Sequence, residues 1–106
     1  MTITHIQSTA QFDTLVKTKA LVADFTSGFC KPCGLIGPKY EQLSKRYPNV
    51  VFVVVDGDKF RDLVFRYEIT GLPTFIMFRG GRVVDVFVGL GEDELERRVT
   101  RFVGGG

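Results

Sequence analysis

The sequence has few of the residues from which metal and nucleic-acid sites are built. Its 106 residues include no tryptophan, two cysteines and one histidine, His5. A structural zinc site needs four ligands, typically cysteine and histidine, so the chain offers too few. The formal net charge is only +2, without a long run of like charge, which argues against nucleic-acid binding. Because no Gly-x-Gly-x-x-Gly fingerprint is present, we expect no dinucleotide cofactor in this chain.

Long apolar segments are also missing. No stretch approaches the roughly 20 apolar residues that cross a bilayer, and residues 1–5 lack the basic and apolar regions of a secretory signal. We therefore expect a cytoplasmic protein, in which thiols stay reduced and a purely structural disulfide would be anomalous. The length and the 44% hydrophobic content predict one domain over residues 1–106, with a flexible glycine tail at 104–106.

Hydrophobic periodicity predicts alternating strands and helices. The expected strands are residues 3–6, 20–26, 50–55, 74–78 and 83–88, and the expected helices are residues 8–19, about 34–47, 60–67 and 92–103. Buried β-α-β units indicate parallel strands with helices on both faces. Gly80-Gly81 is typical of a β-hairpin turn, which adds antiparallel strands at one edge. The order β-α-β-α-β-α-β-β-α thus predicts an α/β fold with a mixed five-stranded sheet and four helices.

The helix expected after the cysteines contains a proline. We place Pro38 inside this helix, where it should cause a kink. The apolar residues at helical spacing predict its buried side as Leu35, Ile36, Tyr40, Leu43 and Tyr47.

The two cysteines form the motif Cys30-Lys31-Pro32-Cys33 directly after a buried strand. In a β-α-β context this spacing favours a redox pair over two incidental cysteines. A thiol at a helix N-terminus is favoured as thiolate by unpaired amides and the helix dipole. Lys31 either adds to that effect or is a solvated loop lysine, while Pro32 suits a first helical turn. Cys33 should lie one turn further and deeper, so Cys30 can attack and Cys33 can resolve.

Further stretches match one family in the same order along nearly the whole chain. They are Val22-Ala23-Asp24-Phe25, Ile36-Gly37-Pro38, Tyr47-Pro48-Asn49-Val50-Val51-Phe52, Val55-Asp56, Gly71-Leu72-Pro73-Thr74-Phe75, Gly80-Gly81 and Val88-Gly89. With the cysteine motif they make the chain resemble small cytosolic thioredoxins. The resemblance implies a thioredoxin fold and a monomeric protein-disulfide reductase without a cofactor. It also implies disulfide-containing protein substrates and recycling by thioredoxin reductase, which would hold the flavin and use NADPH.

The resemblance also implies a role for an acid six residues before the first cysteine. Asp24 stands where thioredoxins keep a buried acid, which would take a proton from Cys33 during resolution. An acid in an apolar strand has a raised pKa because of desolvation. The alternative is an aspartate at the strand edge that points to solvent.

A second implied part of the site is the loop before residue 74. Leu72-Pro73 resembles the family's cis-proline loop, whose backbone pairs with the substrate chain as in β-augmentation. An ordinary trans turn is the alternative. Gly71 and Gly89 resemble glycines near the same groove, where small size permits close approach, although a plain backbone role is equally expected.

Three departures from the family pattern affect this interpretation. Phe29 replaces the usual tryptophan and lacks the indole donor, Lys31 replaces a glycine, and residues 52–55 lack a charged residue near the acid. We therefore expect altered substrate choice, reductase recognition and redox potential. Two other function classes stay open: a specialised oxidoreductase, oxidant or isomerase for narrow clients, and a non-enzymatic scaffold in a complex.

Overall fold

A single mixed sheet forms the centre of the molecule in the computed structural model, which describes residues 2–105, and residue 18 by its backbone only. The strands follow the order β1-β3-β2-β4-β5. Their bounds are Ile3–His5 (β1), Leu21–Thr26 (β2), Val51–Asp56 (β3), Thr74–Arg79 (β4) and Arg82–Val88 (β5). β1, β3 and β2 are parallel, and β4 and β5 are antiparallel to their neighbours. The predicted mixed five-stranded sheet is confirmed.

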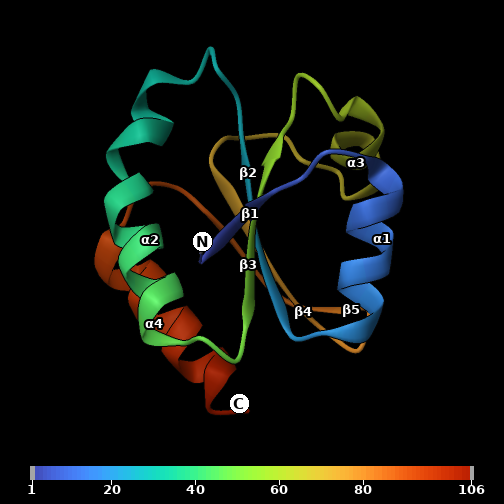
Figure 1. The fold of residues 1–106 in the computed structure, drawn as a ribbon. Coiled ribbons are helices and arrows are strands. Elements are labelled where there is room, and N and C mark those ends of the chain that lie inside the picture. Colours follow the sequence, from blue (N-terminus) through green and yellow to red (C-terminus); the bar gives the residue numbers. More distant parts are fainter. Residues whose placement is uncertain (1, 106) are drawn as a thin grey trace.

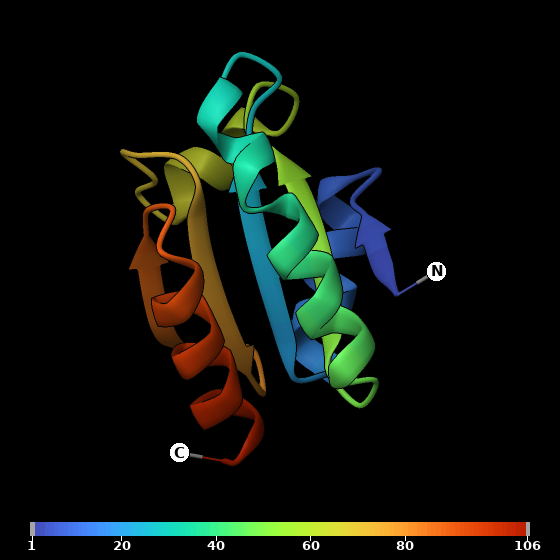
Figure 2. The same ribbon diagram turned by 90° about the vertical axis from the view of Figure 1, so that its left-hand side faces the viewer.

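Four α-helices cover the two faces of the sheet. They are α1 (Thr9–Thr18), α2 (Gly37–Arg46), α3 (Arg61–Arg66) and α4 (Glu92–Val103). α1 and α3 lie on one face, and α2 and α4 lie on the other (Figure 1). Figure 2 shows α2 and α4 side by side in front of the strands. Each face encloses its own apolar core, one around Phe12 and Phe25 and the other around Tyr40 and Phe75.

The central strand β2 determines where the acid and the cysteines lie. Leu21, Val22, Ala23 and Phe25 are fully buried, as the nearly continuous apolar run predicts for a strand covered on both faces. Side chains alternate along a strand, so Asp24 faces the α2 and α4 side, opposite Ala23 and Phe25. β2 then ends at Thr26, four residues before the first cysteine.

The segment after the cysteines differs from the prediction of one long helix. Residues Lys31–Leu35 form a short 3₁₀-helix, η1, and α2 begins separately at Gly37. Pro38 lies in the first turn of α2 and causes no kink inside it. A proline lacks the amide donor that a continuing helix requires, whereas the first turn tolerates it. The chain therefore breaks before Pro38, at Ile36.

This break also corrects the predicted buried side of the segment. Leu35 is 71% exposed, whereas Ile36, Tyr40 and Leu43 are buried as predicted. A 3₁₀-helix has three residues per turn, so the side chains of η1 do not continue the spacing of α2. Leu35 therefore points to solvent.

The turns and ends agree with the sequence pattern. Gly80 and Gly81 both have positive φ, 61° and 83°, as a two-residue hairpin turn requires. The amide groups of Gly104 and Gly105 donate to carbonyls in the last turn of α4, while Gly106 of the predicted tail lies outside the described residues. Within the described chain, no helix is long and apolar enough to span a membrane.

Candidate active site

The two cysteines lie where β2 leads into η1 and are joined by a disulfide bond. Their Cα atoms are 5.4 Å apart. Cys33 is 7% exposed and Cys30 is half-buried, which confirms that the second cysteine lies deeper. The Cys30 amide donates to the carbonyl of Ser27, and the Cys33 amide donates to the carbonyl of Cys30, each at 3.1 Å. Cys30 is thus the residue from which η1 starts.

The helix that begins at Cys30 is shorter than predicted. Cys30 is the N-cap of the five-residue η1, not of the ten-residue α2. Helix-dipole effects decline within the first turn. The Cys30 side chain accepts no capping hydrogen bond from η1, and the dipole of the longer α2 begins only after η1.

Asp24 is a buried acid near the end of β2. Its side chain is 7% exposed, and Oδ1 has no hydrogen-bond partner among the described residues. Its neighbours in the sheet register are Val54 of β3 and Phe75 of β4, both apolar. Desolvation therefore raises the pKa of Asp24 from 3.8 to about 7. Asp24 is thus an internal acid, and not an exposed aspartate.

Tyr40 of α2 is the titratable side chain that interacts with Asp24 from the neighbouring helix. It is fully buried, and burial and the charge of Asp24 raise its pKa well above 10. Its hydroxyl lies 3.0 Å from the carbonyl of Val22 and 2.7 Å from that of Val53, and donates to these backbone oxygens. Tyr40 thereby fastens α2 to β2 and β3 and remains neutral beside the acid.

The loop before β4 has the predicted cis peptide bond, between Leu72 and Pro73. Pro73 is buried, while Leu72 remains 36% exposed. The Gly89 amide donates to the Pro73 carbonyl at 3.1 Å, and Gly89 has a φ of 134° that favours glycine. A Cβ at Gly71 would lie 3.2 Å from Val88. Backbone conformation therefore explains the glycine at position 89, and close packing explains the glycine at position 71.

The three residues expected to modify the pair are all exposed. Phe29 is 90% exposed, and Lys31 and Pro32 also lie at the surface. Within residues 2–105, Lys31 forms no ion pair. These side chains are therefore available to a partner molecule.

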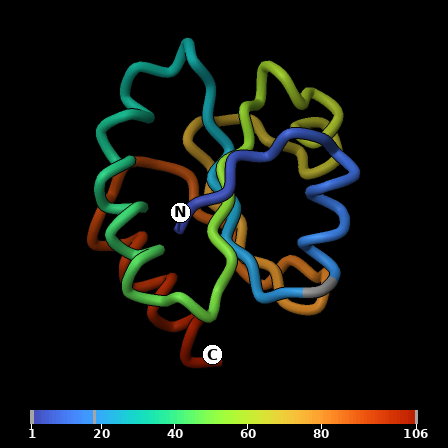
Figure 3. Tube along the Cα trace, viewed as in Figure 1, coloured from blue at the N-terminus to red at the C-terminus, as the bar shows by residue number. Residues whose placement is uncertain are grey.

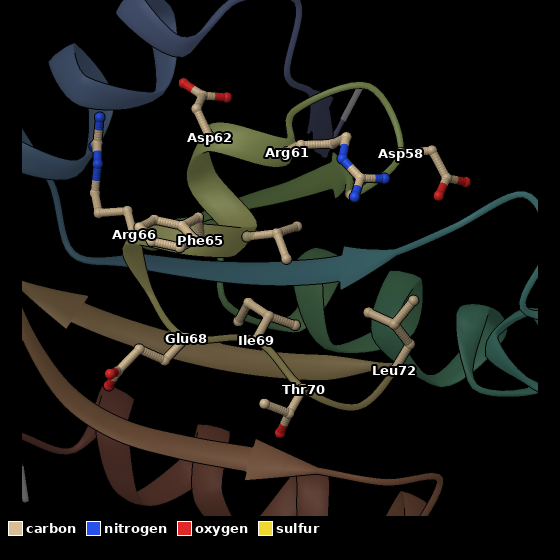
Figure 4. A pocket seen from close by; sticks show the side chains of 11 residues that line it. Asp58, Arg61, Asp62, Phe65, Arg66, Glu68, Ile69, Thr70 and Leu72 are labelled. Carbon is tan, nitrogen blue, oxygen red and sulfur yellow. The ribbon is translucent and has the colours of Figure 1, made fainter.

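A surface cleft beside the cis-proline loop was not predicted from the sequence. Only Leu72 of the predicted site residues lines it, and neither cysteine does. Figure 4 shows Arg61 and Asp62 on one side of the cleft, with Thr70 and Leu72 on the other. The lining residues are Gly57, Asp58, Arg61, Asp62, Val64, Phe65, Arg66, Glu68, Ile69, Thr70 and Leu72.

One sequence signal could have indicated this cleft. The apolar stripe of α3 contains Leu63 and Val64, whereas Phe65 lies off that stripe and is 87% exposed. A large apolar side chain on the polar face of a short helix is a candidate contact residue. Among the described residues, no group of histidine, cysteine, aspartate and glutamate is arranged to hold a metal ion.

Comparisons with known proteins agree with this geometry. The thioredoxin family model matches residues 3–101. A thioredoxin H-type of Picea mariana is 45% identical over 86 residues, which cover 80% of this chain and 69% of the relative. Thioredoxin of Plasmodium falciparum superposes with a TM-score of 0.91 at 31% identity, covering 93% of this chain and 98% of that one.

A second solved structure gives the same result. Oxidised mitochondrial thioredoxin 3 of Saccharomyces cerevisiae superposes with a TM-score of 0.88 at 31% identity, covering 93% and 94% of the two chains. The fold is thus the thioredoxin fold, and the adjacent cysteine pair gives it thiol–disulfide chemistry. By fold, sequence and cysteine motif, the chain belongs to the thioredoxin family and is a thiol–disulfide oxidoreductase.

Proposed function

We propose that this oxidoreductase reduces protein disulfides with Cys30 as nucleophile and Cys33 as resolving thiol. The observation that carries the assignment is their unequal burial: Cys30 is half-buried and Cys33 is 7% exposed. A bulky protein disulfide can reach only the outer sulfur, and the inner sulfur can reach only Cys30. The pair therefore divides attack and resolution between its two members.

The reaction proceeds by two thiol–disulfide exchanges. The Cys30 thiolate attacks one substrate sulfur, forms a mixed disulfide and releases the other substrate sulfur as a thiolate, which takes up a proton. Cys33 then loses its proton to the Asp24 carboxylate and attacks the Cys30 sulfur. The second substrate thiolate leaves, so the substrate gains two electrons and the pair is oxidised to the disulfide. Burial supports this role for Asp24, because a pKa of about 7 suits proton exchange near neutrality.

The cis-proline loop and the neighbouring cleft form the proposed substrate-binding surface. Leu72 is the residue that belongs to both, since it precedes Pro73 and lines the cleft. The backbone at Gly71 and Leu72 would pair with an extended substrate segment, and an apolar substrate side chain would enter the cleft. Gly89 supports this loop through its hydrogen bond to Pro73.

Reduction of the Cys30–Cys33 disulfide requires an external electron donor. We propose a thioredoxin reductase that carries the flavin and uses NADPH, while this chain works without a cofactor. We also propose that the protein is a monomer with a single domain and that it is located in the cytoplasm. Sedimentation of the purified chain and localisation of the tagged protein would test these two assignments.

Reduction of insulin is the direct test of this function. With dithiothreitol as electron source, we expect the chain to accelerate insulin precipitation well above the dithiothreitol background. With NADPH and a thioredoxin reductase, we expect NADPH oxidation that depends on both proteins. Activity with dithiothreitol alone would point to a different physiological reductant. No acceleration under either condition would contradict the proposal and favour the scaffold alternative.

Lys31 is the proposed modifier of redox potential, because its cation is next to the nucleophile in the sequence and forms no ion pair with the described part of the chain. We expect Lys31→Gly to lower the fraction of Cys30 present as thiolate and to make the pair less oxidising. The expected change in the equilibrium with glutathione is about twofold to fivefold, since an exposed charge acts through screened solvent.

Lys19→Gly is the matched control for this experiment. Lys19 is also exposed but precedes β2, whereas Lys31 follows it at the opposite end of the strand. The control should leave the equilibrium unchanged. Lys31 would be an ordinary surface residue if Lys31→Gly had the same equilibrium constant with glutathione as the unmodified chain and reduced the same substrates.

A further inference from the structure

The loop that leads to the cysteines is joined to a second loop by a serine–aspartate pair. The Ser27 hydroxyl donates to the carboxylate of Asp58, and its Oγ accepts the Phe29 amide at 3.1 Å. Ser27 lies between β2 and η1, and Asp58 lies between β3 and α3. Figure 3 shows both loops at the same end of the molecule. One side chain thus connects the cysteine loop to a separate part of the chain.

The aspartate side of this connection is itself well held. The Gly57 amide donates to the Thr26 carbonyl at 2.7 Å, and the Asp58 amide donates to the Asp56 side chain at 2.9 Å. A Cβ at Gly57 would lie 3.2 Å from the Thr26 carbonyl oxygen and 3.1 Å from Val64, so the two chains approach closely there. The backbone that carries Asp58 is therefore held in place, and its carboxylate can hold Ser27.

Apart from the Cys30–Cys33 disulfide and its backbone hydrogen bonds, the cysteine loop makes few contacts that hold it in place. Gly28 has no side chain, and the space around its Cα is open. Phe29 is 90% exposed and packs against nothing substantial. Among the hydrogen bonds of the described residues, the one from Ser27 to Asp58 is the only side-chain bond that joins residues 27–30 to another segment. The position of the Cys30 turn therefore depends on Ser27.

Ser27 acts on the turn through two groups. Its Oγ accepts the Phe29 amide, and its carbonyl accepts the Cys30 amide at 3.1 Å. Because the hydroxyl proton is directed at Asp58, an Oγ lone pair is left for the Phe29 amide. The bond to Asp58 thus orients the oxygen that shapes the turn.

We propose that Ser27 and Asp58 form a positioning pair that holds Cys30 near Cys33 and so favours the disulfide form of the active site. Without the pair, the dithiol form has a wider range of loop conformations, and closing the disulfide loses more conformational entropy. The disulfide is then less stable relative to the dithiol. The proposal rests on the Cys30–Cys33 pair being the redox centre.

The experiment measures the equilibrium in which the dithiol form and oxidised glutathione give the disulfide form and two reduced glutathiones. We expect Ser27→Ala and Asp58→Ala each to lower this constant about threefold to tenfold. That change makes the reduction potential less negative by about 14 to 30 mV. The double variant should match the single ones, because both remove the same interaction. Ser27→Thr keeps the hydroxyl and should restore the constant.

Thr9→Ala is the matched control. The Thr9 hydroxyl donates to the Asp62 carboxylate at 2.7 Å, so it forms the same kind of exposed link without touching the cysteine loop. This variant should keep the constant of the unmodified chain.

An unchanged constant in Ser27→Ala overturns the proposal, as do strictly additive effects in the double variant. A lower melting temperature with an unchanged constant also overturns it, because the pair would then be merely structural. Failure of the proposed function is a separate result. It would appear as no insulin reduction by the unmodified chain, whatever the glutathione constants of the variants.

Discussion

Replacing Cys30 by serine will abolish the reduction of protein disulfides. A serine hydroxyl does not form a useful nucleophile without an adjacent base. Cys33 cannot substitute for the missing thiolate, because it is 7% exposed and a protein disulfide cannot approach its sulfur. We expect the insulin reduction rate to fall at least about 1,000-fold, to the uncatalysed background.

Cys33→Ser is the companion variant, and it should behave differently. Attack by Cys30 remains possible, but resolution does not, so the mixed disulfide with the substrate should accumulate. Mass spectrometry after incubation with a disulfide-bonded protein would detect a covalent complex that dithiothreitol releases. A complex trapped by Cys30→Ser instead would reverse the proposed roles, and residual activity in Cys30→Ser would refute them.

Replacing Asp24 by asparagine will stabilise the oxidised protein at neutral and alkaline pH. Burial raises the pKa of Asp24 from 3.8 in the unfolded reference to about 7. Between these values the folded chain binds more protons than the unfolded chain, so the free energy of unfolding falls as pH rises. This difference in pKa lowers the free energy of unfolding by about 4 kcal/mol, and the full loss is reached above pH 7. An uncharged asparagine avoids this loss.

The pH profile makes this prediction specific. The free energies of unfolding of Asp24→Asn and the unmodified chain should be similar near pH 4. The variant should gain steadily up to pH 7 and keep a constant advantage above it. Denaturant unfolding of the oxidised proteins at several pH values would measure this. Asp93→Asn, which changes an exposed acid on α4, is the control and should show no such gain. A pH-independent difference for Asp24→Asn would contradict a raised pKa.

The sequence predicts strands, turns and helices correctly where a single local residue pattern determines the structure. The apolar run of β2 and the Gly80-Gly81 turn each carry their own signal, and both appear at or within one residue of the expected positions. The burial of Asp24 is what the family resemblance implies, whereas the sequence pattern alone leaves a solvent-facing aspartate at the strand edge open. The deeper position of Cys33 followed from its spacing after Cys30.

Other features were not predicted. They depend on two opposing local preferences, or on contacts between segments far apart in the sequence. The apolar spacing continues across Pro38 and so predicts a helix interior there, but the missing amide donor of proline separates η1 from α2. The cleft gathers residues between Gly57 and Leu72. The Ser27–Asp58 pair joins residues 31 positions apart, at places fixed by the sheet register. No local pattern in one sequence specifies such contacts.

The break between η1 and α2 separates the reactive cysteine pair from the helix that packs on the sheet. The Cys30–Cys33 bond lies between the loop after β2 and the five-residue η1, outside α2. The hydrogen bonds of α2 begin at the Ile36 carbonyl, which accepts the Tyr40 amide. The Tyr40 hydroxyl also fastens that helix to the sheet through backbone oxygens. Because the disulfide lies outside α2 and the sheet, we expect the core to keep one arrangement in the oxidised and reduced forms.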